Sequence, residues 1–183
     1  MKPRKPRRIR VGISACLLGR QVRYDGGHKR DRSILTTLGR RFELVPVCPE
    51  LEAGLGVPRE PLRLEGRSAS PRLVFTHTRG DLTGRMNAWA RRRLRELEKM
   101  GLCGFVLKSK SPSCGLERVR LYQPGRPGAP GRPGAPSRKG QGLFARAVVK
   151  HFPRLPVVEE LLLHDRAGRA EFVRRVLACR EKA

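Results

Sequence analysis

Short apolar runs alternate with longer amphipathic segments along this chain, and the alternation predicts strands separated by helices. Three of the runs are bounded by basic residues, glycine or proline, and each predicts a buried strand: residues 11–15, 42–47 and 102–107. The stretches between them show helical periodicity, first over residues 31–38 and then from Asp81 or Thr83 to about Met100. Parallel strands need connections of this length. The pattern therefore predicts three parallel neighbours in one sheet.

The rest of the chain adds weaker elements to this frame. The long helix places its apolar side chains on one face, at Met86, Trp89, Ala90, Leu94 and Leu97. Further helices are predicted over residues 142–152 and 167–180, and further strands over residues 73–76 and 155–158. Residues 53–71, rich in Gly and Pro, are expected to form a loop. Together these elements predict an α/β fold, a single three-layer domain with a mainly parallel sheet.

Length and cysteine count narrow the class of protein. A chain of 183 residues suits one ordinary domain. No run approaches the ~18 apolar residues that span a bilayer, and the basic start is not followed by the apolar stretch of a secretory signal. The sequence therefore predicts no membrane association and no export. Five cysteines, an odd number, are then expected to be reduced thiols in the cytoplasm, available to a metal, a cluster or catalysis.

The formal net charge is +25, from 41 Lys and Arg against 16 Asp and Glu. Part of the excess lies in a basic N-terminal extension, residues 1–10, and part in a Pro/Gly-rich insertion, residues 124–140, which repeats Pro-Gly-Arg-Pro-Gly-Ala. The folded domain is expected to cover residues 11–183 around that insertion. Two explanations of the charge remain open: contact with a polyanion such as RNA, or a compositional bias toward Arg, Ala, Gly and Pro.

Three cysteines stand where the apolar runs end. Cys16, Cys48 and Cys114 have Pro or Gly close by, so they are expected on loops that leave the strands. Because open α/β folds bind ligands at the carboxyl edge of the sheet, the three thiols could meet at one site. The alternative is that they are three small buried hydrophobes. Their wide spacing excludes a zinc finger, a zinc ribbon and the compact ferredoxin pattern. Cys103 is expected in the core, and Cys179 is expected to pack or to be exposed without a role.

Five ordered motifs lie around these cysteines. They are Val-Gly-Ile-Ser-Ala-Cys-Leu-Leu-Gly, Val-Arg-Tyr-Asp-Gly-Gly-His-Lys, Pro-Val-Cys-Pro-Glu, Val-Pro-Arg-Glu-Pro and Lys-Ser-Lys-Ser-Pro-Ser-Cys-Gly. In this order they resemble the thiouracil desulfurase (TudS) family over about residues 9–172. The resemblance implies a [4Fe-4S] cluster at the carboxyl edge of the strands, held by Cys16, Cys48 and Cys114. It also implies iron-sulfur-dependent, non-redox desulfuration of a thiolated pyrimidine to its oxo form: 2-thiouracil, 4-thiouracil, thiouridine or thiouridine in tRNA.

The same motifs imply roles for further residues. Glu50 and Ser111 match the family's catalytic positions, where a carboxylate can move protons and a hydroxyl can orient substrate or water. Three thiolates would leave one iron open to bind the soft sulfur of a thiocarbonyl group. Other matches to the surrounding pattern are the candidate substrate-binding residues Asp25, Lys108 and Lys110, together with His28 and Arg59.

An alternative hypothesis explains the net charge and includes no iron-sulfur cluster. It is a basic RNA-binding module whose cysteines hold a structural metal ion or none. The expected partner is a small thiolated pyrimidine under the first hypothesis, with tRNA as a further partner suggested by the charge. Under the second hypothesis RNA is the partner.

Overall fold

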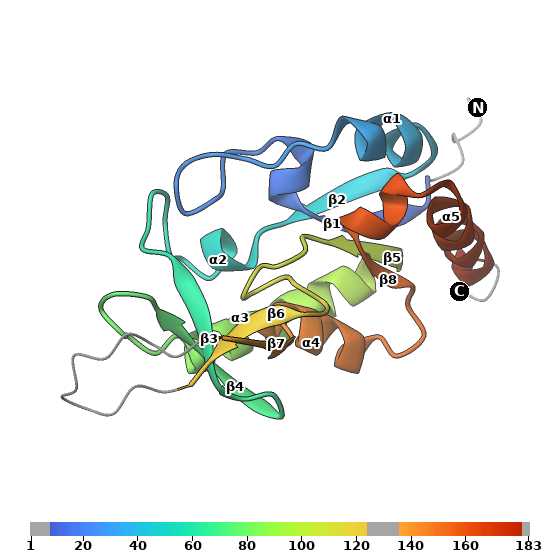
Figure 1. The fold of residues 1–183 in the computed structure, drawn as a ribbon. Helices are drawn as coiled ribbons and strands as arrows, with labels where there is room; N and C mark the ends of the chain where they lie inside the picture. The colour runs from blue at the N-terminus through green and yellow to red at the C-terminus, as the bar shows by residue number, and fades with distance from the viewer. Residues whose placement is uncertain (1–7, 124–135, 181–183) are drawn as a thin grey trace.

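The computed structural model describes residues 8–123 and 136–180, which form two four-stranded sheets and the helices that pack on them (Figure 1). The first sheet is wholly parallel and has the order β2-β1-β5-β8. Its strands are β1 (Arg10–Ser14), β2 (Glu43–Val47), β5 (Leu102–Leu107) and β8 (Val157–Glu159). The three strands predicted from the apolar runs are therefore parallel neighbours, as expected.

Helices cover both faces of this sheet and give the three predicted layers. They are α1 (Arg32–Arg41), α2 (Pro49–Glu52), α3 (Thr83–Lys99), α4 (Leu143–His151) and α5 (Arg166–Arg180), with the 3-10 helices η1 (Ala15–Leu18) and η2 (Glu160–His164). Apolar residues of α1 and α5 pack on one face of the sheet, and those of α3 and α4 on the other. Among the described helices, none combines the length and the apolar character needed to cross a bilayer.

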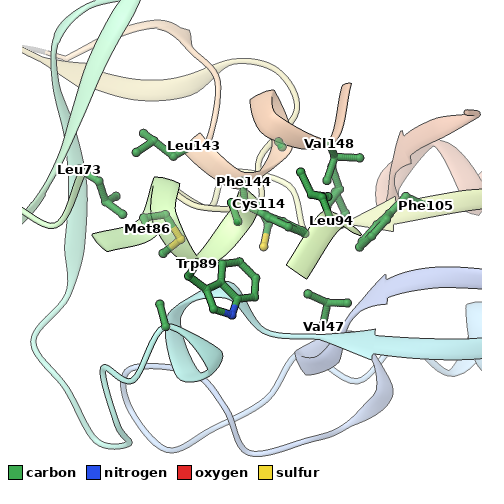
Figure 2. Packing of buried hydrophobic residues seen from close by; sticks show 14 of the residues in the cluster. Val47, Leu73, Met86, Trp89, Leu94, Phe105, Cys114, Leu143, Phe144 and Val148 are labelled. Carbon is green, nitrogen blue, oxygen red and sulfur yellow. The ribbon is translucent and has the colours of Figure 1, made fainter. Parts of the chain in front are cut away.

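Aromatic and aliphatic side chains fill the interface under α3 and α4 (Figure 2). Trp89 packs against Phe144 with ring centroids 5.2 Å apart, and Phe105 of β5 meets Phe144 edge-on at 5.7 Å. The whole predicted apolar face of α3 is buried. Each such side chain contributes about 1.5–3 kcal/mol on burial. This packing fixes the sheet, and with it the positions of the strand ends.

A second, mixed sheet lies beside α3 and α4, with the order β4-β3-β6-β7. Its strands are β3 (Leu62–Arg67), β4 (Ser70–Phe75), β6 (Val119–Tyr122) and β7 (Ser137–Gly140). The loop expected over residues 53–71 is therefore wrong from Leu62 onward. The sequence pattern of β3 did not indicate a strand, because a charged residue stands at one of its buried positions. This residue is Glu65, whose carboxylate pairs with Arg63 and Arg79.

The two basic segments predicted at the sequence level are only partly described. Residues 1–7 of the extension and residues 124–135 of the insertion lie outside the described residues. At the edges of these gaps, Arg10 begins β1 and residues 137–140 form β7. The Arg10 guanidinium pairs with Glu43 at 3.1 Å and donates a hydrogen bond to the carbonyl oxygen of Met100 at 2.9 Å.

A bulge at Cys103 and Gly104 gives β5 one residue more than β1 between two paired positions. Both residues consequently face α5, where a Cβ on Gly104 would lie 2.8 Å from Val176. Cys103 is 6% exposed, which confirms its predicted place in the core. Its thiol lies against that of Cys179, and burial together with this contact raises the pKa of Cys103 to about 11.

The proline inside β2 is explained by the strand order. Pro46 has no N–H to donate, but β2 is an edge strand, where the missing donor can face away from the ladder. The strand predicted at 42–47 therefore forms despite its proline.

Candidate active site

The ends of β1, β2 and β5 border a cleft of about 350 Å³. The segments that follow these strands line it: residues 14–16 after β1, residues 47–50 after β2, and residues 108–112 with Cys114 after β5. Parallel strands bring these segments to the same carboxyl edge. Residues 22–24, Lys29, Arg59, Pro61 and Leu62 complete the lining. The three cysteines that the sequence places at strand ends all line the cleft, and we call them the cleft cysteines: Cys16, Cys48 and Cys114.

Each cleft cysteine lies in or next to a turn that is stabilised by neighbouring residues in the sequence. Cys16 belongs to η1, a short 3-10 turn directly after β1. Cys48 precedes α2, and Pro49 takes the first helical position, where a missing N–H is harmless. Cys114 lies in a turn closed by Ser111, whose Oγ accepts a hydrogen bond from the Cys114 N–H at 3.0 Å. Local structure thus directs all three thiols out of the strands.

The cleft cysteines share one electrostatic environment. Burial and, less strongly, the nearby Cys48 thiol raise the pKa of Cys16 to about 11, against the opposing charge of Lys108. Burial likewise raises the pKa of Cys114, against a hydrogen bond from Ser14. In the metal-free protein these thiols are therefore protonated at neutral pH. Metal ligation needs thiolates, so loading a metal centre releases protons from this cleft.

The donor set of the cleft is three thiols, which suits a soft metal centre. Within residues 8–123 and 136–180, no three His, Cys, Asp or Glu side chains lie close enough to hold one metal ion. A structural zinc site needs four ligands around one atom. An iron-sulfur cluster instead binds its thiolates through separate iron atoms. Three thiols around one cleft are a donor set that such a cluster can use.

Glu50 of α2 lines the cleft and is held from two sides. Its Oε2 accepts hydrogen bonds from Arg59 Nη2 at 2.5 Å and Nε at 3.0 Å, and its Oε1 accepts one from Ser113 Oγ at 2.9 Å. Arg59 also donates to the carbonyl oxygens of Val22 at 2.9 Å and Gly56 at 2.7 Å. The side chains of Arg59 and Glu50 are only 3% and 15% exposed. These charge-assisted contacts give the carboxylate one fixed orientation.

The two serines of Ser-Pro-Ser-Cys have different surroundings. Ser111 Oγ accepts hydrogen bonds from the N–H groups of Ser113 and Cys114, and its own hydroxyl hydrogen has no acceptor among the described residues. Ser111 lines the cleft, so that hydrogen is available there. Ser113 is fully buried and donates to Glu50. The motif predicts a role for Ser111 but not for Ser113, although Ser113 is the second serine of the same motif.

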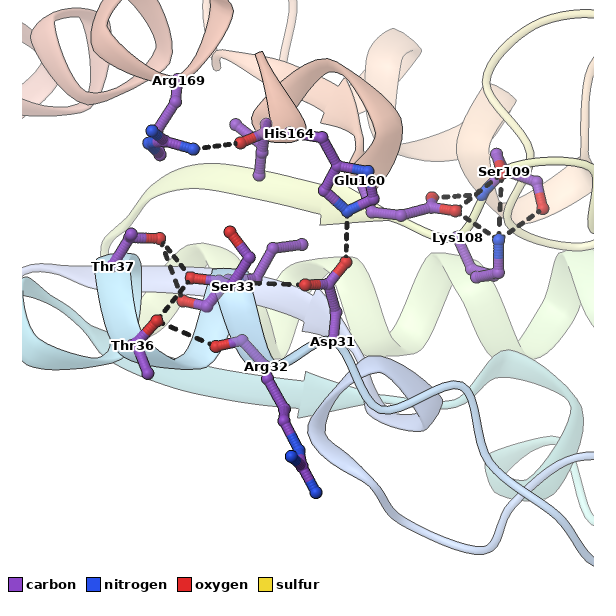
Figure 3. A network of polar contacts seen from close by, with 12 residues as sticks. Asp31, Arg32, Ser33, Thr36, Thr37, Lys108, Ser109, Glu160, His164 and Arg169 are labelled. Atoms are coloured by element: carbon purple, nitrogen blue, oxygen red, sulfur yellow. Dashed lines mark hydrogen bonds and ion pairs between the residues drawn. The ribbon is translucent and has the colours of Figure 1, made fainter. Parts of the chain in front are cut away.

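The candidate substrate-binding residues divide between two places. Lys108 and Lys110 line the cleft, and the Lys108 ammonium contacts the buried carboxylate of Glu160 (Figure 3). Asp25 is not among the described residues that line it. Its Oδ1 accepts a hydrogen bond from the Gly27 N–H at 3.0 Å, as expected for a residue that stabilises a turn.

Comparison with known proteins agrees with this geometry. The model of the 2-thiouracil desulfurase family matches residues 11–160. The solved structure of a [4Fe-4S]-dependent thiouracil desulfidase, TudS, is 30% identical and superposes with a TM-score of 0.65, over 91% of this chain and 99% of that chain. The uncharacterized protein YbbK of Bacillus subtilis (strain 168) is 31% identical over 108 residues, which cover 56% of this chain and 71% of YbbK.

The family match extends from β1 to the first residue of η2. It includes the cleft cysteines, Glu50 and Ser111, and it covers most of the chain. On the match to the family model and on the shared fold, this chain belongs to the 2-thiouracil desulfurase family.

Proposed function

We propose that this protein removes sulfur from a thiolated pyrimidine with a [4Fe-4S] cluster, and that the cleft cysteines hold that cluster. The observation that carries the proposal is three thiols from three strand ends around one cleft that also contains the carboxylate of Glu50. Membership in the 2-thiouracil desulfurase family supports the reaction, and the similarity to a structure named for its [4Fe-4S] dependence supports the cofactor.

When bound, such a cluster supplies a soft Lewis acid, because one iron without a cysteine can take the sulfur of a thiocarbonyl group. The residues of the chain then handle water and protons. Glu50 Oε1 accepts one hydrogen bond within the described residues, so it has capacity left to take a proton from an attacking water. The reaction exchanges C=S and H₂O for C=O and H₂S. Both protons of the water end on sulfur, and no electrons are gained or lost.

Three further side chains prepare this proton transfer. Arg59 and Ser113 keep the Glu50 carboxylate from rotating. The Ser111 hydroxyl, whose oxygen is fixed by the turn, can donate to the pyrimidine ring or to the water. Lys108 and Lys110 add positive charge along the cleft, which favours a substrate with a polar or negatively charged group.

The cleft sets the size of the substrate. Its volume of about 350 Å³ lies near the lower end of small-molecule sites and has to hold the cluster as well, which favours a substrate as small as a single pyrimidine ring. The proposed substrates are 2-thiouracil, 4-thiouracil, thiouridine and thiouridine in tRNA. The last of these would need its base turned out of the stack to enter the cleft.

Anaerobically reconstituted protein tests the proposal by sulfide release from 2-thiouracil and 4-thiouridine. Glu50→Gln should keep its iron and slow the reaction by about 10²–10⁴, as loss of a proton-transfer group does. Ser111→Ala should also keep its iron and react slowly. Glu171→Gln, an exposed carboxylate on α5, is the control and should keep the full rate. Full activity of Glu50→Gln would remove that residue from the mechanism, and no sulfide release by the wild type would overturn the proposal.

The net charge of +25 favours a second candidate function, RNA binding with a structural metal ion or none. Purified protein separates the two candidates. A Cys-ligated cluster makes the protein brown, with absorbance at about 400 nm. A colourless protein that binds tRNA and releases no sulfide would support the second candidate.

A further inference from the structure

Two consecutive carboxylates, Glu159 and Glu160, contact both ends of the loop that follows β5. This loop, residues 108–117, supplies Ser111, Ser113 and Cys114 to the site. Glu159 ends β8 and Glu160 begins η2. We propose that the two carboxylates are positioning residues: they form a two-point clamp that fixes the loop, and Glu160 also holds the Lys108 ammonium beside the cleft.

Glu160 makes the first point of the clamp, at the start of the loop (Figure 3). Its side chain is 4% exposed. Oε2 accepts a hydrogen bond from the Ser109 N–H at 2.6 Å, and Oε1 accepts one from the Ser109 hydroxyl at 2.7 Å and contacts the Lys108 ammonium. The Lys108 N–H donates to Ser14 Oγ at 2.9 Å. The ends of β1, β5 and β8 are thus tied together where the loop begins.

Glu159 makes the second point, at the far end of the loop. Its Oε1 accepts hydrogen bonds from the N–H groups of Leu116 at 2.8 Å and Glu117 at 3.2 Å. Successive N–H groups that face one way form a small anion site, and here a side chain of the protein fills it. Ser111 and Cys114 lie between the two points, so both are held on a segment that is fixed at each end.

A buried ion pair contributes little net stability, because desolvation offsets most of its attraction. What Glu160 adds is geometry, since its two oxygens accept from donors in fixed directions. Site residues must be held within about 0.5 Å of their working positions. The clamp explains how an irregular loop meets that demand. It also holds the Lys108 ammonium at the lining of the cleft.

The inference rests on the proposed function at one point only, the role of Cys114 in this loop as a cluster ligand. The clamp itself is therefore tested first in the metal-free protein. Amide hydrogen exchange is measured in Glu160→Gln and Glu159→Ala, with matched substitutions at the exposed Glu171 as controls. In Glu160→Gln an NH₂ group replaces one of the two acceptor oxygens. This group then faces hydrogen-bond donors of Ser109 and Lys108, so at least one hydrogen bond is lost. We expect exchange over residues 109–117 to rise at least tenfold, the change for one lost charge-assisted hydrogen bond. In Glu159→Ala the rise should be confined to residues 114–117.

A second measurement separates positioning from ordinary stabilisation. Glu160→Gln removes the negative charge that pairs with Lys108 and leaves that ammonium uncompensated at the cleft lining, so the reduction potential of the reconstituted cluster should rise. Glu159→Ala and the Glu171 controls should leave the potential unchanged. A carboxylate with a merely structural role would not move it.

The outcomes are distinct. Unchanged exchange over residues 109–117 in both folded variants would overturn the clamp. An unchanged reduction potential in Glu160→Gln would overturn the second part of the inference, that Glu160 holds the Lys108 ammonium beside the cleft. If Glu160→Gln does not fold, the partly exposed Glu159 decides, since Glu159→Ala must still raise exchange over residues 114–117. Failure of the wild type to take up a cluster would instead overturn the proposed function and leave the exchange result standing.

Discussion

Arg59 should be the residue whose loss disturbs Glu50 most. Its guanidinium makes four hydrogen bonds: two to Glu50 Oε2 and one each to the carbonyl oxygens of Val22 and Gly56. Arg59→Met keeps an unbranched apolar chain in the same space and removes every donor. The Glu50 carboxylate then keeps only the contact from Ser113.

The expected cost follows from the burial of the pair. With side chains 3% and 15% exposed, water replaces few of the lost contacts. Removing one partner of a buried ion pair costs about 3–5 kcal/mol, because the other charge stays buried and unpaired. Glu50→Gln keeps its shape and one acceptor, and should cost about 1.5–3 kcal/mol, the contribution of a hydrogen bond to a charged group. The double variant should cost about 1–3 kcal/mol less than the sum, since the same contact is lost only once.

Urea unfolding, followed by circular dichroism, gives the free energy of unfolding of the wild type, the two single variants and the double variant. All four are measured in metal-free form, so that a cofactor adds nothing to their stability. Arg174→Met is the control, because its pair with Glu171 is exposed, and it should show no measurable change. If the costs of Arg59→Met and Glu50→Gln simply add to within about 0.5 kcal/mol, the two side chains are not coupled and the argument for a held carboxylate is refuted.

Three further predictions concern cofactor, stability and RNA. Replacing any cleft cysteine by Ser should abolish cluster retention, whereas Cys103→Ser and Cys179→Ser should not; an iron assay after anaerobic reconstitution decides, and full iron in Cys114→Ser would contradict the ligand set. Folding raises the pKa of the Cys103 thiol from 9.0 to about 11, so between these pH values the folded protein binds more protons than the unfolded protein, and stability should fall as the pH rises from 9 to 11. Cys103→Ala should reduce that fall in urea midpoints, and an identical pH profile would contradict the assignment. If the basic residues bind tRNA, affinity should fall by roughly 0.7–0.9 log units per log unit of salt for each phosphate contacted, and deleting residues 1–7 should flatten the slope; an unchanged slope favours compositional bias.

Periodicity was sufficient to predict the first sheet and α3. The runs that became β1 and β5 are buried almost throughout, and that of β2 is buried at Val45 and Val47, so all three contain few polar residues and end at clear breakers. The strand predicted at residues 73–76 overlaps β4, whereas β3 escaped prediction because its buried positions include a charge. Glu65 is 3% exposed and neutralised by two arginines, one of them from a later loop. A pairing of that kind depends on the tertiary fold and leaves no periodic signal.

The site shows the same division between local and distant information. The cleft cysteines could be proposed because each follows an apolar run and a turn signal. Glu160 could not, because its partners Lys108 and Ser109 lie about fifty positions away and only the order of the strands brings them near. Ser113 was missed for another reason: a serine in a turn is common, and only the structure shows that it faces Glu50.

Both edges of the parallel sheet are poor templates for another strand. On one edge stands β2, where Pro46 interrupts the row of donors that an incoming chain would need. On the other stands β8, which has only three residues. A protein that must exist for a time without its cofactor presents unfilled thiols and an open cleft. Edges that resist strand addition protect such a protein from edge-to-edge aggregation before the cofactor is inserted.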